Sequence, residues 1–561
     1  MKQKRLILSS ILLASLFSFS FLISYKNYYG DHEIYVKLEK FDNIDINVKG
    51  PRNEVWEQMN ELVFFKRTSS YYIIEKSILK VYFVCKDSFN SSINMILKVE
   101  YKDETVSQDY IVKNVNYEEK EARSNYRLKL LSLKFNLLET FNMVDYDVIS
   151  NLLLYFETGE NTKYITQYPL KVTIKRLQSG TKQGSIICSK CFWFRNDDDY
   201  KYLLWWIELN KQIGYSKVQF CNQSIPNSRE FNQIFETYRD FIDVRQFHFI
   251  PNFKSRHNSP YEHNYLTDYN QLSESDFGWN LDGYHVLHTN ECFLENADKY
   301  EYVTVVDNDE TIIPSIINSK LRKKVDNFNY VKSLNLNSIQ KEVNSVNLAC
   351  ELDAKTNYIG SYLKSFGTMK NFHFGMAYYL KDVDLKRIFN AFEDYFNSTS
   401  FNSNSFDHVI QVIDYEKKSE FHNPYDYKFE IKNADELAYA RNLLFLYRNF
   451  IEKFENKYKA VLNSYSEQFH RFFYISGEAT NWLCGKSIWH TDRTSEYSVH
   501  YGVVAENLNT LDFNDGHNGH FRVNYPFKAD KIRITELSLD FNYLNCFYKP
   551  IIEKFANISI F

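Results

Sequence analysis

Two carboxylates spaced two residues apart follow a short run of β-branched residues. Asp307 and Asp309 come directly after residues 302–306 (Tyr-Val-Thr-Val-Val), and Glu310 follows them. Residues two apart on a strand point to the same side, and where a strand gives way to a loop both carboxylates can converge on one point. Such hard oxygen ligands suit Mn²⁺ or Mg²⁺, which keep their other positions for water and substrate phosphates. A solvated acidic loop is the commoner origin of such a pair, so its surroundings have to decide.

Strands and helices alternate from about residue 183 onward, and this alternation predicts a parallel α/β sheet. Ligands of open α/β sheets bind outside the carboxyl ends of the strands, which is where Asp307 and Asp309 are expected to lie. The predicted strands are 184–188, 217–221, 243–250 and 302–306, and the predicted helices are 199–213, 228–238 and 284–296. The position of the acidic pair after several such units favours a binding site over an acidic loop.

An uncharged run at residues 6–24 follows the basic residues Lys2, Lys4 and Arg5. A spanning helix needs roughly 20 mostly apolar residues, and the basic flank favours a cytoplasmic N-terminus. No small-x-small cleavage pattern follows the run, so a signal-anchor is favoured and a cleavable signal peptide is the main alternative. The sequence therefore predicts a single-pass type II membrane protein. Its cytoplasmic tail is 1–5, its signal-anchor helix is 6–24, and the chain from residue 25 onward lies in the secretory lumen.

The lumenal part is too long for one hydrophobic core. Short β-branched and aromatic runs predict a β-rich stem or accessory domain at 25–182, followed by an α/β domain at 183–530 and a C-terminal extension at 531–561. The formal net charge of −4 shows no basic excess, which argues against nucleic acid as a partner.

Eight cysteines in a lumenal chain make disulfides plausible, although their pairing cannot be deduced from the sequence. Cys188 and Cys191 have the spacing of a zinc or redox pair, but no second Cys-x-x-Cys completes a tetrahedral site. Structural disulfides are therefore the favoured role of the cysteines. Acceptor sequences for N-glycosylation occur at Asn90, Asn222, Asn397 and Asn557.

Four segments of the chain share a pattern with known proteins: 188–224, 288–314, 485–490 and 519–522. In this order they resemble the family 92 glycosyltransferases, formerly a domain of unknown function. The first resembles the family's opening strand, its Leu-x-x-Trp-Ile-Glu helix and the next strand. The second resembles its Asn-Asp-Cys helix followed by Asp-x-Asp-Glu-x-x-x-Pro, with Glu291 in place of the first Asp. The last two resemble its Lys-Ser-Ile segment and its closing His-Tyr-Arg, with Phe521 in place of Tyr.

This resemblance implies a GT-A-like (Rossmann-type) glycosyltransferase core behind the β-rich domain, on a Golgi membrane protein with a lumenal catalytic domain. It implies transfer of a hexose, above all galactose from UDP-galactose, with inversion. The acceptor would be a glycan on a glycoprotein or polysaccharide. Homodimerisation is left open.

The resemblance also implies a metal ion at the acidic pair. Asp307 and Asp309 are the expected ligands, with Asp309 the stronger candidate for direct contact. A late histidine often adds a third ligand in such enzymes, and His500 lies at a suitable distance after the Lys-Ser-Ile segment. Imidazole suits Mn²⁺ better than Mg²⁺, so Mn²⁺ is the preferred expectation.

The remaining chemistry needs cations for the diphosphate and a base for the acceptor. Lys486 and Arg522, together with Asp307, are expected in the nucleotide-sugar site, where cationic groups stabilise the leaving diphosphate. Inverting transfer also needs a carboxylate to accept the proton of the acceptor hydroxyl. Glu478 and Asp492 both stand in turn-like sequence and are the candidates.

Two other classes of protein fit parts of the pattern. In a haloacid-dehalogenase-type phosphatase, Asp307 would be the nucleophile and Asp309 the acid or base. That family carries its motif on the first strand of its domain, whereas here at least three strand–helix units precede it. The second alternative is a catalytically silent glycan-binding protein on the same fold, which would bind nucleotide without transferring sugar.

Overall fold

The computed structural model describes residues 39–41 and most of 56–246, 284–314 and 359–557, with shorter gaps between elements. The chain divides into two compact units, residues 1–177 and 178–561. Among the described helices, none combines the length and apolar character needed to span a membrane. The predicted anchor at 6–24 lies outside the described residues.

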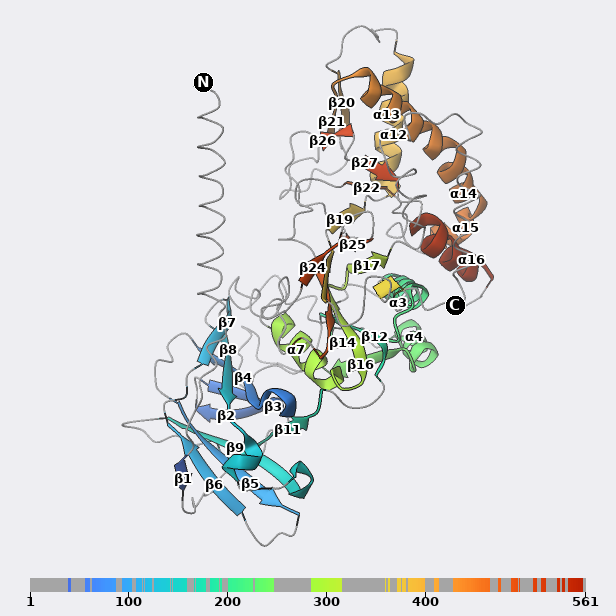
Figure 1. The fold of residues 1–561 in the computed structure, drawn as a ribbon. Helices are drawn as coiled ribbons and strands as arrows, with labels where there is room; N and C mark the ends of the chain where they lie inside the picture. The colour runs from blue at the N-terminus through green and yellow to red at the C-terminus, as the bar shows by residue number, and fades with distance from the viewer. Residues whose placement is uncertain are drawn as a thin grey trace, which may run out of the picture. The chain divides into compact units, whose positions relative to one another are not determined.

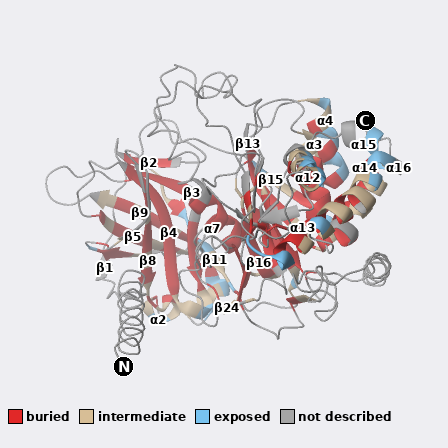
Figure 2. Ribbon diagram, turned by 90° about the horizontal axis from the view of Figure 1, so that it is seen from above, coloured by how far each residue is buried: buried red, intermediate tan, exposed pale blue. Residues whose placement is uncertain are grey.

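Unit 1 consists of two β-sheets that share one core. Alternate residues of facing strands point inward, as the period of two requires: Leu79, Val81 and Phe83 from one sheet meet Met95 and Leu97 from the other. The strands of this unit are accordingly mostly buried (Figure 2). The first sheet has the order β1 (Glu39–Phe41), β6 (Ser107–Val112), β5 (Ile93–Tyr101), β9 (Ile149–Thr158) and β10 (Leu170–Lys171). The second has the order β11 (Thr173–Lys175), β3 (Val63–Ile73), β4 (Ile78–Lys86), β8 (Tyr126–Lys134) and β7 (Tyr117–Arg123), and β2 (Trp56–Asn60) also pairs with β3.

Unit 2 is a mixed α/β unit with a central sheet. Four of its strands are mutually parallel and have the spatial order β15-β14-β12-β16, which is third, second, first and fourth along the chain. These strands are β12 (Gln183–Ser189), β14 (Lys217–Ser224), β15 (Ile242–Gln246) and β16 (Tyr300–Val306). The sheet continues through antiparallel β23 (Lys486–His490) to β18 (Asn371–Phe374) and β24 (Leu508–Thr510), and the short β13 (Phe192–Trp193) also pairs with β14.

Helices cover both faces of this sheet. α3 (Tyr200–Ile213) and α4 (Arg229–Tyr238) lie on one side and α7 (Tyr284–Asn296) on the other (Figure 1). α3 ends at Gly214, whose φ of 98° is in the left-handed region that glycine adopts without a steric penalty. The side chain of Ser228 caps α4 by accepting a hydrogen bond from the Phe231 amide.

A second sheet extends the unit beyond the acidic pair. Its order is β17 (Glu310–Pro314), β25 (Gly516–His520), β19 (Met376–Tyr379), β22 (Phe473–Ile475) and β27 (Leu537–Leu539), and a small third sheet contains β20 (His408–Val412), β21 (Tyr427–Ile431) and β26 (Ile532–Arg533). The later helices are α12 (Asp382–Asn397), α13 (Ala434–Leu446), a π-helical turn η6 (Tyr447–Ile451), α14 (Glu452–Lys457), α15 (Lys459–Ser464) and α16 (Lys549–Asn557).

The C-terminal segment belongs to the core of unit 2. Residues 531–561 were expected as an extension, yet Leu537, Phe547 and Ile552 are buried in the same cluster as the helices and the central sheet. Lys554 of α16 also donates to Glu208 of α3 over 2.6 Å, and the Tyr238 hydroxyl of α4 donates to the same carboxylate. This carboxylate thus joins α3, α4 and α16.

Candidate functional site

The central sheet changes direction between β12 and β16. The chain first adds β14 and β15 on one side of β12 and then returns to place β16 on the other side. Such a switch point opens a crevice at the carboxyl ends of its two strands, and ligands of open α/β sheets bind there. Ser189 of β12 is the register partner of Val306 of β16. The residues that follow them, Lys190 and Asp307, therefore lie next to each other at the carboxyl ends of the two strands.

Asp307 lies between two ammonium groups. Lys190 Nζ is 3.6 Å from one carboxylate oxygen, Oδ2, and Lys486 Nζ is 3.6 Å from the other, Oδ1. Lys486 also lies 3.1 Å from Glu310 Oε2, and the Asp307 amide donates to the same Glu310 oxygen over 3.0 Å. Lys486 and Glu310 are fully buried, whereas the Lys190 and Asp307 side chains reach solvent. A buried ammonium needs such compensation, because an unpaired buried charge is costly.

One stripe of α3 holds the turn that carries the acidic motif. The Tyr202 hydroxyl donates to the Asn308 carbonyl over 2.8 Å, and Trp206 Nε1 donates to the Glu310 carbonyl over 3.0 Å. The Thr311 hydroxyl donates to Asn210 Oδ1. The three helix residues are four apart and therefore share one face of α3. The positions of residues 307–311 are thus fixed by a buried helix.

The second sheet places the closing block beside the acidic motif. β17 and β25 are antiparallel, and Glu310 is the register partner of His520. The first two residues of the segment 519–522, which resembled the family's closing motif, therefore lie across from Thr311 and Glu310. The sequence alone gave no reason to expect this pairing, because about 200 residues separate the two strands.

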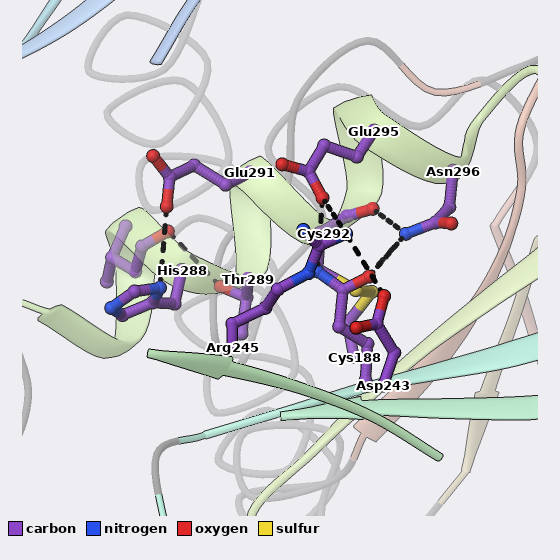
Figure 3. The surroundings of a disulfide bond; sticks show 11 residues. Cys188, Asp243, Arg245, His288, Thr289, Glu291, Cys292, Glu295 and Asn296 are labelled. Carbon is purple, nitrogen blue, oxygen red and sulfur yellow. Dashed lines mark hydrogen bonds and ion pairs between the residues drawn. A yellow bond between two sulfur atoms is a disulfide. The ribbon is translucent and has the colours of Figure 1, made fainter. Parts of the chain in front are cut away.

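A disulfide joins the strand before Lys190 to the helix before β16. Cys188 of β12 is bonded to Cys292 of α7, with 5.7 Å between their Cα atoms (Figure 3). Arg245 of β15 reinforces the same face by pairing with Asp243 and with Glu295 of α7, each over 3.0 Å. Cys188 therefore does not form a zinc or redox pair with Cys191. Cys221 and Cys546 are also disulfide-bonded.

The structure brings three of the predicted site residues together. Asp307 and Lys486 are in contact, and Asp309 lies in the turn between β16 and β17, which the Glu310 amide closes by donating to the Asp307 carbonyl over 3.1 Å. The predicted residues Glu478, His500 and Arg522 lie outside the described residues.

Asp492 lies at the wrong end of the sheet for the predicted role of base. β23 runs antiparallel to β16, and His490 is the register partner of Tyr302, so Asp492 lies near the amino end of β16. Seven residues of strand separate that end from Asp307, roughly 20 Å at about 3.3 Å per residue. Asp492 is paired there with Lys182. The prediction failed because the direction of β23 could not be deduced from sequence spacing.

The donor set at the switch point fits a hard divalent cation. Within the described part of the chain, no group of three or more His, Cys, Asp and Glu side chains is arranged to hold a metal ion. Mg²⁺ and Mn²⁺ sites in phosphoryl-binding proteins often use one or two carboxylates and complete their coordination with phosphate and water. Two ammonium groups lie 3.6 Å from Asp307, so a metal ion bound there would share this carboxylate with them or displace one of them. Asp307 and Asp309 would hold such an ion.

The buried tyrosines near the switch point are structural. Burial, with the nearby charge of Glu301, raises the pKa of Tyr302 to about 12, and burial also raises the pKa of Tyr215. The Tyr215 hydroxyl donates to Thr304 Oγ1 over 3.2 Å inside the sheet. Both phenols are therefore neutral at physiological pH and are unsuited to act as bases.

Sequence reasoning missed Lys190 and the α3 stripe. Lys190 could have been found, because it follows β12 as Asp307 follows β16 and the same carboxyl-end argument applies to both. The roles of Tyr202 and Asn210 depend on long-range contacts that no local pattern reveals.

Comparison with known proteins gives one result for this region. Residues 183–373 match the model described as glycosyltransferase family 92. No curated protein matches the chain. The matched range contains β12 to β16, the acidic motif, Lys190 and the α3 stripe.

Proposed function

We propose that the protein transfers galactose from UDP-galactose to a glycan with inversion, on the premise that residues 183–373 match the glycosyltransferase family 92 model. The observation that carries the proposal is the position of Asp307 and Asp309, within the matched range and at the carboxyl end of β16 beside the switch point. Cations next to Asp307 and the hard donor set support a metal-assisted diphosphate leaving group.

The residues around the acidic turn have distinct roles in the proposed reaction. Asp307 and Asp309 would hold the cation, which would supply positive charge to neutralise the departing diphosphate. Lys486 forms ion pairs with Asp307 and Glu310 and adds positive charge to the site. The α3 stripe keeps the turn rigid, so the ligands are preorganised before the donor binds.

The transfer step is a single displacement. The acceptor hydroxyl forms a bond to the anomeric carbon of galactose while the bond from that carbon to the diphosphate oxygen breaks. The hydroxyl proton passes to a carboxylate, and UDP leaves with the electron pair of the broken bond. Glu478 is the proposed base, Arg522 a proposed diphosphate contact and His500 the proposed third metal ligand.

The proposed function includes a GT-A-like fold and a location in the Golgi lumen. The third-second-first-fourth order of the parallel strands matches the nucleotide-binding half of Rossmann-type sheets and supports a GT-A-like domain. The Cys188–Cys292 disulfide supports an oxidising compartment such as the Golgi lumen. The anchor at 6–24 and a homodimer rest on the sequence-based expectation alone.

The first experiment measures donor binding with the full-length protein in detergent. We expect UDP-galactose to bind in the presence of Mn²⁺ and to be hydrolysed slowly, and we expect both effects to disappear in Asp309→Asn, which loses a charged ligand but keeps its shape. Calorimetry and release of free galactose are the readouts. Asp492→Asn is the matched control, because that carboxylate lies at the other end of the sheet.

Three outcomes separate the alternatives. Binding of no nucleotide sugar by the folded protein would contradict the transferase. Binding without transfer to any glycan in an acceptor array would favour the silent glycan-binding alternative. Unchanged Mn²⁺ affinity in His500→Ala would contradict the proposed third metal ligand.

A further inference from the structure

We propose that Lys190 is an exchangeable counterion of the donor site. Without a divalent cation its ammonium group neutralises Asp307. Once a cation is bound to that carboxylate, the ammonium group moves to the diphosphate of the nucleotide sugar. This inference rests on the proposed function, because it concerns the same donor site.

The two lysines beside Asp307 differ in their freedom to move. Lys486 is fully buried and is held by Glu310 as well as by Asp307. The Lys190 side chain is 23% exposed, and its ammonium group lies 3.6 Å from Asp307 Oδ2. A lysine side chain is a flexible four-carbon stem, so Lys190, which already reaches solvent, can turn away from Asp307. Lys190 is therefore the cation that can leave.

Repulsion between a divalent cation and the Lys190 ammonium group favours movement of Lys190 away from Asp307. A divalent ion at Asp307 and the Lys190 ammonium would be like charges within a few ångströms of each other. The diphosphate brings negative oxygens to the same crevice, since ligands lie outside the carboxyl ends of β12 and β16. Lys190 directly follows the last residue of β12 and so lies at the carboxyl end of that strand. The displaced ammonium group thus has a new anionic partner within reach.

This exchange predicts opposite effects on two binding steps. In Lys190→Met, Mn²⁺ alone should bind about two- to fivefold more tightly, because the ammonium group that competes with it for Asp307 is gone. The size of the effect is that of one partly exposed ion pair. UDP in saturating Mn²⁺ should bind about tenfold more weakly, because one charge-assisted contact to phosphate is lost. Lys190→Arg keeps the charge, so both affinities should stay within about twofold of the parent protein.

The test is isothermal titration calorimetry on the full-length protein, first with MnCl₂ and then with UDP at saturating Mn²⁺. Lys217→Met is the matched control. Lys217 is partly buried and lies in the same sheet, but at the amino end of β14, away from the carboxyl ends where Lys190 and Asp307 lie. It should change neither affinity. Far-ultraviolet circular dichroism and the thermal midpoint check that each variant is folded.

The outcomes distinguish the inference from the function on which it rests. If the parent protein binds UDP with Mn²⁺ and Lys190→Met weakens both steps or changes neither, the exchange is wrong and the donor site stands. If the parent protein binds no UDP at any Mn²⁺ concentration, the proposed function falls and the inference falls with it. Opposite shifts in the two steps, absent from Lys217→Met, are the expected result.

Discussion

Lys486 is the most constrained charge in the site. Its side chain is fully buried and it balances Asp307 and Glu310. In Lys486→Met the two carboxylates keep their charge but lose this ammonium group. We expect the free energy of unfolding of unit 2 to fall by about 3–5 kcal/mol, as for other broken buried ion pairs. Urea unfolding followed by tryptophan fluorescence measures the change.

A second substitution tests whether charge is the cause. Glu310→Gln added to Lys486→Met removes one of the uncompensated carboxylates and should restore part of the lost stability. A purely additive loss in the double variant would show that Lys486 acts through packing instead.

At the scale of elements, α3 determines the geometry of the acidic turn. Tyr202→Phe removes the hydrogen bond to the Asn308 carbonyl, which should lower the free energy of unfolding by only about 1 kcal/mol. Mn²⁺ affinity should fall more clearly, because Asp307 and Asp309 flank that carbonyl. Calorimetric titration with MnCl₂ measures it. Tyr200→Phe is the control, since residues two apart on a helix do not share a face, and equal effects in both variants would contradict the prediction.

In unit 1, Asp109 makes stability depend on pH. Burial raises its pKa above the ordinary value, and the charge of Lys98, its register partner on β5, lowers it only in part. A carboxyl whose folded pKa exceeds its unfolded pKa stabilises the fold below the unfolded pKa, and this contribution is lost as the pH rises through the folded pKa.

Asp109→Asn should therefore raise the thermal midpoint of unit 1 at pH 7 relative to the parent protein. The gain should shrink as the pH falls through the folded pKa and vanish below the unfolded pKa, where the Asp109 carboxyl is neutral in both states. Differential scanning calorimetry over this pH range measures it. A gain that is constant with pH would mean that the amide improves packing and that the charge of Asp109 is not responsible.

Local patterns predicted individual elements better than their relative directions. The helix predicted at 284–296 is α7 at the same residues, because an uninterrupted helical pattern has clear ends there. Asp492 was misplaced because nothing near it reveals that β23 runs antiparallel to β16. The contact between Lys190 and Asp307 depends on the register of two strands whose residues are more than 100 positions apart. Such contacts are properties of the sheet and not of either strand.

At the scale of the whole molecule, each unit has its own core. Separate cores favour two unfolding transitions instead of one. Replacing Cys188 and Cys292 by serine should lower the stability of unit 2 by about 4–5 kcal/mol, the chain-entropy estimate for a loop of about 100 residues. The transition of unit 1 in the same urea titration is the internal control. A shift of both transitions would show that the units unfold together.

Length and composition indicated more than one domain. Four short segments indicated a resemblance to family 92, and residues 183–373 match the model of that family. Cysteine pairing was beyond prediction, because eight cysteines allow about 105 complete pairings. The place of residues 531–561 in the core was also missed, because α16 packs against α3 from more than 300 positions away. Long-range packing of this kind leaves no local signature.

The Cys188–Cys292 bond makes the intervening chain a covalent ring. A protease that cuts one peptide bond inside this ring opens it but does not divide the molecule. The nicked protein would migrate as a single band in denaturing electrophoresis and would separate into two only after a thiol is added. Lys190 and Asp307 lie on opposite fragments of such a molecule, yet the bridge would still tether both to one another.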